Sequence, residues 1–129
     1  MKFKYSKDYK PSAPRIKALI ITAKQEKHEL ELIVDTGFSG GVLIPYSLYE
    51  KLGLTLLEVQ DKYYGVLPIG IPITLHTALT RVIIGDLVFK VHVHSHPLIN
   101  KKLAGRELLN KMKILLNGPL EELEIIEER

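Results

Sequence analysis

The chain has 129 residues, of which 46% are hydrophobic and 26% are charged, and this predicts one globular domain with a modest core. It contains no cysteine, which excludes a disulfide framework, a thiol nucleophile and a thiolate metal site, and favours a reducing compartment. No apolar run approaches the roughly 20 residues that span a bilayer, and residues 1–10 are too polar for a signal peptide. We therefore expect a cytoplasmic protein without a membrane partner.

The net charge of +3 is unevenly distributed, with lysine and arginine crowding the start of the chain and glutamate its end. Residues 1–14 contain Pro11 and Pro14 and lack apolar periodicity, so we expect an extended basic arm there, followed by the domain at residues 15–129. Such an arm could contact nucleic acid, but no helix-turn-helix, zinc-finger or interleaved aromatic pattern supports that partner. We expect instead a solvated tail, or a segment that lies near the acidic carboxy-terminus.

The first half of the domain is predicted to be mainly β. Residues 15–23 are rich in isoleucine and alternate enough to be a strand, and residues 29–34 are a second strand, so the two should pair as a hairpin across the polar turn at 24–27. After a glycine-rich turn, residues 42–44 are expected to be a short buried strand. Residues 45–52 then favour a short helix that ends at Gly53.

The second half is predicted to continue this pattern. Residues 55–65 and 71–84 are expected to be the strands of a long hairpin with an apolar tip. A tight turn at 84–87 should lead into a strand at 88–94, whose period-2 pattern is strong. Residues 104–112 favour a helix, and residues 114–116 and 123–126 a closing hairpin. The chain is thus predicted to be mostly β, with two short helices.

A carboxylate, that of Asp35, follows an apolar strand at a point where folding alone gives no reason for a charge. Asp-Thr-Gly by itself is ordinary turn chemistry. After Leu-Ile-Val, however, Asp35 would emerge from a core strand into a partly desolvated position, where a carboxylate needs hydrogen-bond donors. The amide of Gly37 can approach it closely because glycine has no Cβ.

Two segments resemble those of one known family. The run LELIVDTGFSGGVLIP, residues 30–45, is similar to the active-site segment of the retropepsin-like aspartic proteases, the family of retroviral proteases. The run KLAGRELLNKMKILLNG, residues 102–118, resembles that family's apolar, Gly-Arg and Leu-rich helical segment. Two motifs in the right order, with a flap-like hairpin between them, are far more specific than the tripeptide. The resemblance covers roughly residues 15–116 and implies a closed, barrel-like retropepsin fold with a flap.

The resemblance implies an aspartic endopeptidase that acts as a homodimer on peptide or protein substrates without a cofactor. The chain has one Asp-Thr-Gly motif, so each subunit would contribute one Asp35 across a two-fold axis. By resemblance, Thr36 holds the two loops in register, Gly37 supplies backbone donors, and Arg106 supports the site. A catalytically silent dimerisation or peptide-binding module of the same fold is the alternative.

The hairpin between the two motifs would be the flap that closes over the substrate, with Pro68 stiffening its tip. An ordinary hairpin that packs on the body of the protein is the alternative. The substrate is expected to contact Phe38 and Ser39 beside the Asp-Thr-Gly turn, and Tyr64, Leu67, Pro68, Ile69 and Gly70 in the hairpin.

Two positions depart from the family's pattern. Phe38 stands where the family usually has a small residue, and it could narrow the cleft or occupy a specificity pocket. Ser39 stands where retroviral enzymes have an acidic residue that pairs with the arginine of the Gly-Arg motif. Arg106 must therefore find another partner, either a backbone carbonyl or Glu107.

Other candidate sites are weaker. His92, His94 and His96 occur at period 2 and should share one strand face, but ligands two apart lie roughly 6 to 7 Å apart, too far for three in succession to surround one ion comfortably. We expect no metal and a solvent-facing or weakly packed strand face. Ser39 and Ser47 lack the order of partners that a serine triad needs, and FSGG lacks the lysine of a phosphate-binding loop.

Overall fold

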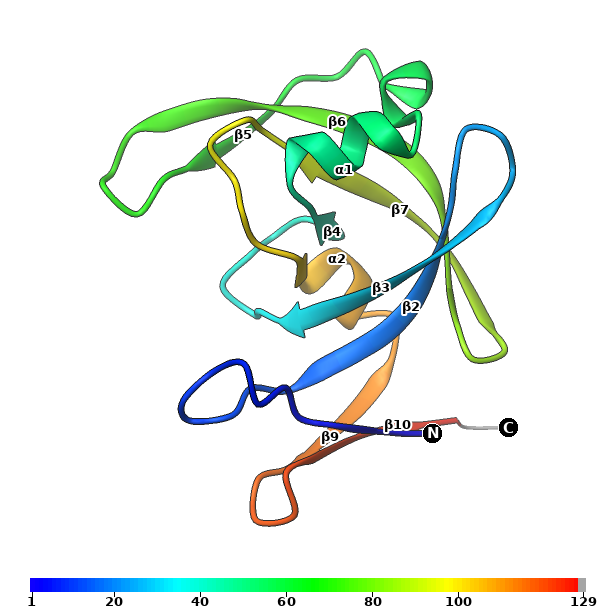
Figure 1. The fold of residues 1–129 in the computed structure, drawn as a ribbon, viewed down its shortest axis with the longest axis vertical. Helices are drawn as coiled ribbons and strands as arrows, with labels where there is room; N and C mark the ends of the chain where they lie inside the picture. The colour runs from blue at the N-terminus through cyan, green and yellow to red at the C-terminus, as the bar shows by residue number, and fades with distance from the viewer. Residues whose placement is uncertain (128–129) are drawn as a thin grey trace.

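A ring of strands encloses the hydrophobic core in the computed structural model, which describes residues 1–127. Within those residues, hydrogen-bonded neighbours run in the order β2-β3-β8-β4-β7-β6, and β6 pairs with β2 to close the ring (Figure 1). The strands of the ring are β2 (Arg15–Ile21), β3 (Lys27–Val34), β4 (Val42–Leu43), β6 (Pro72–Ile84), β7 (Leu87–Ser95) and β8 (Leu103–Ala104). The predicted mostly β, closed barrel-like fold is confirmed.

Alternating burial explains why the long strands form. In β2 the side chains of Ile16, Ala18 and Ile20 are at most 3% exposed and point into the ring, while Lys17 points to solvent. The two short strands β4 and β8 are buried at every position. β8 pairs parallel with β3 and antiparallel with β4, so both short strands run through the interior of the domain. The loop after β3 is therefore anchored by main-chain hydrogen bonds on two sides.

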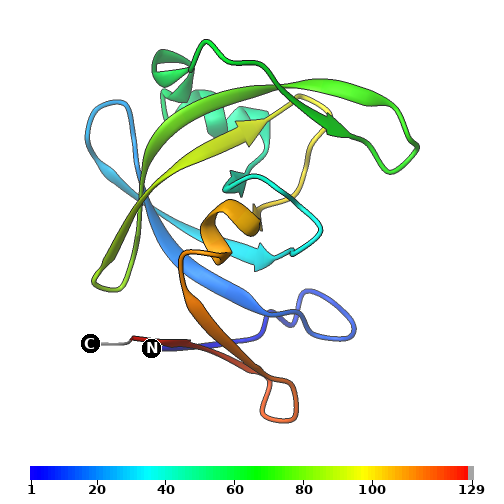
Figure 2. The ribbon, with the colours of Figure 1, turned by 180° about the vertical axis from the view of Figure 1, so that it is seen from behind.

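A hairpin projects from the ring on one side, and both views show it reaching well beyond the body of the domain (Figures 1 and 2). It consists of β5 (Tyr63–Val66) and the first part of β6, with Tyr63 opposite Leu75. At its tip, the Gly70 N–H donates to the Leu67 carbonyl at 2.7 Å, and Gly70 has a φ of 86°, which favours glycine.

The predicted strand at residues 55–65 is wrong in its first part. Leu54–Leu57 form a 3-10 helix, η1, in which Leu54 is fully buried, and the strand β5 begins only at Tyr63. A short apolar run does not by itself distinguish a strand from a helical turn. Here the left-handed Gly53, with φ 71°, starts a new turn directly after α1 (Tyr46–Lys51), which places Leu54 in the core.

The second predicted helix is also shorter than expected. α2 spans Arg106–Leu109, because Leu103–Ala104 are drawn into the sheet as β8 and the chain must turn into β9 (Lys113–Asn117). No helix among residues 1–127 is long and apolar enough to cross a membrane.

A small sheet at the lower end of the domain joins the two ends of the chain. Among residues 1–127 its order is β1-β10-β9, with β1 (Lys2–Lys4) antiparallel to β10 (Glu122–Ile126) (Figure 1). Lys2 stands opposite Glu124, and Lys4 opposite Glu122. The amino-terminal segment, expected to be an extended arm, thus lies beside the acidic end of the same chain and forms part of a sheet.

Candidate active site

Asp35 lies one residue beyond the end of β3, at the mouth of the ring. Its N–H donates to the carbonyl of Ala104 in β8 at 2.9 Å, which extends the β3–β8 pairing by one residue and fixes the backbone of Asp35. Its carboxylate oxygen Oδ1 accepts a hydrogen bond from the N–H of Gly37 at 2.9 Å. A Cβ at Gly37 would stand 3.2 Å from that oxygen, so glycine gives the carboxylate room.

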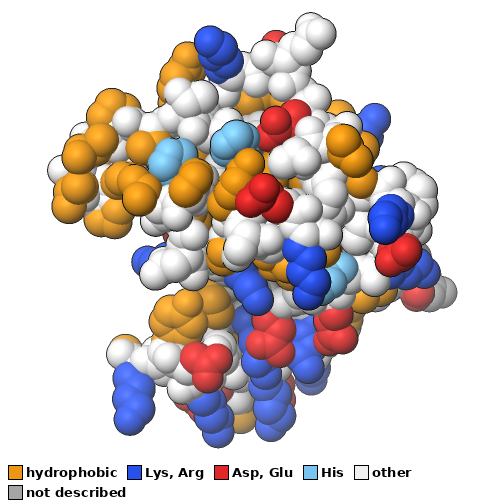
Figure 3. Space-filling model, turned by 45° about the horizontal axis from the view of Figure 1, so that its top comes forward, with side chains coloured by type: hydrophobic (Ala, Val, Ile, Leu, Met, Phe, Trp, Pro, Cys, Tyr) orange, Lys and Arg blue, Asp and Glu red, His pale blue; other side chains and the backbone are white. Residues whose placement is uncertain are grey.

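A cleft of about 600 Å³ opens above Asp35. One side is the loop after β3 and the other is the underside of the β5–β6 hairpin. Hydrophobic side chains gather over this hairpin, at the left of the space-filling view (Figure 3). The exposed ones are Tyr64, Val66, Ile69 and Ile71, of which Ile69 is 76% exposed. Of these, Tyr64 and Val66 line the cleft, and together with Phe38 and Leu67 they give it an apolar surface.

The predicted site residues divide into three groups. Asp35, Gly37, Phe38, Ser39, Tyr64, Leu67 and Pro68 line the cleft. Ile69 and Gly70, which were expected to contact substrate, are at the exposed tip of the hairpin and are not part of the lining. Thr36 and Arg106 also lie outside the lining, and both are exposed in the single chain.

The segment that closes the far side of the cleft was not predicted from the sequence. Leu98, Ile99, Asn100 and Lys101 line it, in the loop between β7 and β8, and Leu98 is 66% exposed. The sequence feature that could have indicated it is the apolar pair Leu98-Ile99, which stands in a polar turn just before the second motif. These residues line the cleft only because the closed ring of strands brings the β7–β8 loop close to Asp35, and the sequence does not show this.

Arg106 ties the loop to α2. Its Nη1 donates to the carbonyl oxygen of Thr36 at 2.7 Å, and its backbone N–H donates to the carbonyl of Phe38 at 2.8 Å. The sequence left two partners open for the Arg106 side chain, a backbone carbonyl or Glu107, and the structure shows the backbone carbonyl. The guanidinium thus supports the turn that follows Asp35 through its backbone, at the Thr36 carbonyl.

Glycines allow this loop to pack directly on α2. A Cβ at Gly105 would overlap the carbonyl oxygen of Gly40 and would stand 2.7 Å from that of Phe38. A Cβ at Gly41 would come within 2.6 Å of the Glu107 carboxylate. The second motif therefore needs its glycine because the backbones of two distant segments touch here.

The histidine face of β7 differs from the prediction. His94 is only 3% exposed, so this end of the strand is packed rather than solvent-facing, and His96 lies beyond the end of β7. The His94 Nδ1 and the Thr77 hydroxyl are 2.8 Å apart, and the ring meets that of Phe38 edge-on at 5.8 Å. No cluster of three or more His, Asp or Glu side chains suited to a metal ion occurs among residues 1–127.

His94 is held in its neutral form. Burial, assisted by the neighbouring His92, lowers the pKa of His94 to about 4, although Glu107 acts in the opposite direction. His92 and Glu107 form an ion pair or hydrogen bond at 2.7 Å, and Tyr63 reaches His92 from the root of the β5–β6 hairpin. These four residues line a cavity of about 130 Å³ that shares Phe38 and Ser39 with the main cleft.

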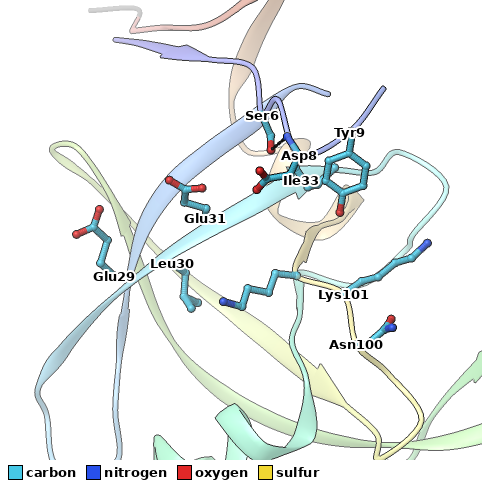
Figure 4. Close-up of a pocket in the computed structure, with 10 residues that line it drawn as sticks. Ser6, Asp8, Tyr9, Glu29, Leu30, Glu31, Ile33, Asn100 and Lys101 are labelled. Carbon is cyan, nitrogen blue, oxygen red and sulfur yellow. Dashed lines mark hydrogen bonds between the residues drawn. The ribbon is translucent and has the colours of Figure 1, made fainter. Parts of the chain in front are cut away.

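A second, open groove of about 530 Å³ lies on the other side of the β7–β8 loop. Ser6, Asp8 and Tyr9 line it from the amino-terminal segment, Glu29 and Glu31 from β3, and Asn100 and Lys101 from the loop (Figure 4). The Asp8 N–H donates to the Ser6 hydroxyl at 3.3 Å, and Glu31 pairs with Arg15 at 2.9 Å. Most side chains that line the groove are polar or charged, and its lining within residues 1–127 contains no glycine like the one beside Asp35 in the main cleft.

Comparison with solved structures identifies the fold. A retropepsin-like aspartic protease from Rickettsia conorii matches with a TM-score of 0.61 and 18% identity, over 95% of this chain and 86% of that one. The retroviral protease-like domain of Ddi1 from Leishmania major matches with a TM-score of 0.54 and 16% identity, over 88% and 87%. EIAV protease, solved with an inhibitor, matches with a TM-score of 0.52 and 18% identity, over 84% and 93%.

No protein-family model matches the sequence. No curated protein matches it either. The structural matches extend over most of both chains, so the protein has the retropepsin-like fold, as the two motifs predicted.

Proposed function

We propose that the protein is a homodimeric aspartic endopeptidase in which each subunit contributes one Asp35. The observation that carries this proposal is the position of the Asp35 carboxylate. It lies on the floor of a cleft large enough for a peptide, bonded to the Gly37 N–H and covered by a projecting hairpin. The retropepsin-like fold supports the same activity, since three solved proteins of that fold are described as proteases or protease-like.

The proposal requires two chains because a water attacking a peptide bond needs both a base and an acid. One carboxylate of a close pair takes a proton from water, while the other, protonated, donates to the carbonyl oxygen. Two carboxylates within hydrogen-bond distance share one proton, because ionising both is unfavourable. Asp8, Asp61 and Asp86 lack the following Thr-Gly, so the partner carboxylate is the second copy of Asp35, related by a two-fold axis.

The surrounding residues would serve substrate binding and loop support. Phe38, Tyr64 and Leu67 provide apolar surface in the cleft for side chains on either side of the scissile bond. Arg106 holds the Thr36 carbonyl, which leaves the exposed side chain of Thr36 available to its counterpart in the second copy. The β5–β6 hairpin would close over the bound peptide and exclude water from the site.

The decisive experiment compares Asp35→Asn with the unchanged protein in cleavage of a library of apolar peptides between pH 3 and 7. The variant should fold, dimerise in sedimentation experiments and cleave nothing, because an amide cannot act as the base. The matched control is Asp61→Asn, an exposed aspartate outside the cleft lining, which should cleave normally. Equal turnover by the Asp35 variant would refute the proposal.

A catalytically silent peptide-binding module is the second candidate, and Phe38 favours it. Its ring lines the cleft, where it would compete with a substrate side chain for space. Peptides that bind to the unchanged dimer without being cut anywhere in the same pH range would support this candidate. A Phe38→Ala variant that gains cleavage would show that the ring alone blocks the site.

A further inference from the structure

Three side chains, those of Tyr63, His92 and Glu107, connect the root of the β5–β6 hairpin to α2, which contacts the loop that carries Asp35. The Tyr63 hydroxyl and the His92 Nε2 are 3.2 Å apart, and the two ring centroids are 5.1 Å apart. On its other side, the His92 Nδ1 is 2.7 Å from the Glu107 carboxylate. The second oxygen of Glu107 accepts the backbone N–H of His92 at 2.8 Å, so Glu107 holds both the ring and the strand.

Glu107 is itself attached to the loop after Asp35. Its backbone N–H donates to the Gly40 carbonyl at 3.2 Å, and its carboxylate lies where a Cβ on Gly41 would have to go. The neighbouring Arg106 donates to Phe38 and Thr36. The short α2 therefore contacts the loop through its backbone and is linked to the hairpin indirectly, because the Glu107 side chain binds His92 and His92 contacts Tyr63.

We propose that His92, held by Glu107, is a positioning residue. Through the hydroxyl of Tyr63 it fixes the root of the β5–β6 hairpin relative to the loop after β3, which carries Asp35. This inference rests on the proposed function in one respect, that the hairpin closes over a peptide. Tyr63 is the first residue of β5, so a constraint there limits the swing of the whole hairpin. It leaves the tip free to adapt.

The hydrogen bonding makes the constraint independent of the charge of His92. An ionised Glu107 only accepts, so Nδ1 of His92 carries a proton and donates to it. Nε2 of the neutral ring then accepts from the Tyr63 hydroxyl, whereas a protonated ring donates to the same oxygen. Either form keeps the two contacts.

The same logic provides a conservative variant. In Glu107→Gln, the amide oxygen can accept from the His92 N–H while the amide nitrogen donates to Nδ1. The ring proton then moves to Nε2, which donates to Tyr63. We expect Glu107→Gln to preserve the constraint and Glu107→Ala to remove it.

The test measures hydrogen exchange of residues 63–75 in the intact protein by mass spectrometry, together with peptide cleavage. Tyr63→Phe removes one hydroxyl and should accelerate exchange in this segment about two- to tenfold, the range for one lost hydrogen bond. Its KM should rise by a similar factor with kcat within about twofold, because a looser hairpin must be ordered at each binding event.

Tyr49→Phe is the matched control. It also removes a tyrosine–carboxylate hydrogen bond, from the buried Tyr49 of α1 to the partly exposed Glu58 at 2.8 Å, away from the Tyr63 hydroxyl. It should lower stability without a selective effect on residues 63–75.

Three outcomes would overturn the inference: unchanged exchange in Tyr63→Phe, equal hairpin acceleration in Tyr49→Phe, or a Glu107→Gln variant as loose as Glu107→Ala. Failure of the unchanged protein to cut any peptide would instead count against the proposed function. The exchange measurements would still decide the inference about the hairpin.

Discussion

Acidification should weaken the folded state through His94. The ring is 3% exposed, and burial lowers its pKa from 6.5 to about 4. Between these two values the unfolded chain binds a proton at this position and the folded protein does not. Stability contributed by the neutral ring is therefore complete above pH 6.5 and is lost as the pH falls toward 4.

The size of this effect follows from the two pKa values. The unfolded chain binds this proton at pH 4.5 but hardly at pH 7. The free energy of unfolding should therefore fall by about 2 kcal/mol between pH 7 and pH 4.5. This is a substantial part of the stability of a domain of this size.

Urea unfolding followed by fluorescence or circular dichroism at pH 7 and pH 4.5 measures the effect. His94→Asn replaces the ring with an amide that does not titrate, so the variant should be less stable at pH 7 and should lose about 2 kcal/mol less on acidification. The matched control is His28→Asn, at a half-buried position near the start of β3. It should keep the pH dependence of the unchanged protein. Equal pH dependence in His94→Asn and the unchanged protein would refute this reasoning.

Two further substitutions test the support of the loop. Gly105→Ala should lower the free energy of unfolding by about 1 to 3 kcal/mol and reduce cleavage, because its Cβ would overlap the Gly40 carbonyl. The control is Gly118→Ala, whose Cβ would have nothing within 4 Å. A Gly105 variant as stable as the Gly118 variant in urea would contradict the close approach of the two backbones. Arg106→Lys should lose the hydrogen bond to the Thr36 carbonyl and lower the free energy of unfolding by about 1 kcal/mol. It should also weaken the proposed dimer in sedimentation experiments. Undiminished dimer affinity would show that this bond is not needed.

The sequence predicted the strands whose hydrophobic pattern is strong and the turns whose residues are specialised. The tight turn at Gly85, with φ 59°, and the helix end at Gly53 were both predicted and found. Residues 55–57 were misassigned because an apolar run of that length suits either a strand or a turn of helix. The extent of α2 was misjudged because β8 takes Ala104 into the sheet, and such a pairing depends on β3 and β4.

The candidate site was predictable as far as its motif extended. Asp35 with its Gly37 donor was expected, and a backbone carbonyl was one of the two partners considered for Arg106. The lining by Leu98 and Ile99 was not, because it requires the loop before β8 to fold over the cleft. The burial of His94 was also missed, since period 2 specifies a shared face but not what packs on it.

The sequence by itself determined the local chemistry of this protein: a carboxylate after a buried strand, glycines where backbones must approach, and an alternating pattern that selects strands. These properties depend on neighbours along the chain. Only the tertiary structure decided which distant groups meet, such as Glu107 with His92 and Tyr63, and which histidine loses its contact with water. The physical reason is that desolvation and hydrogen bonding depend on distances in space, which are set when the ring of strands closes.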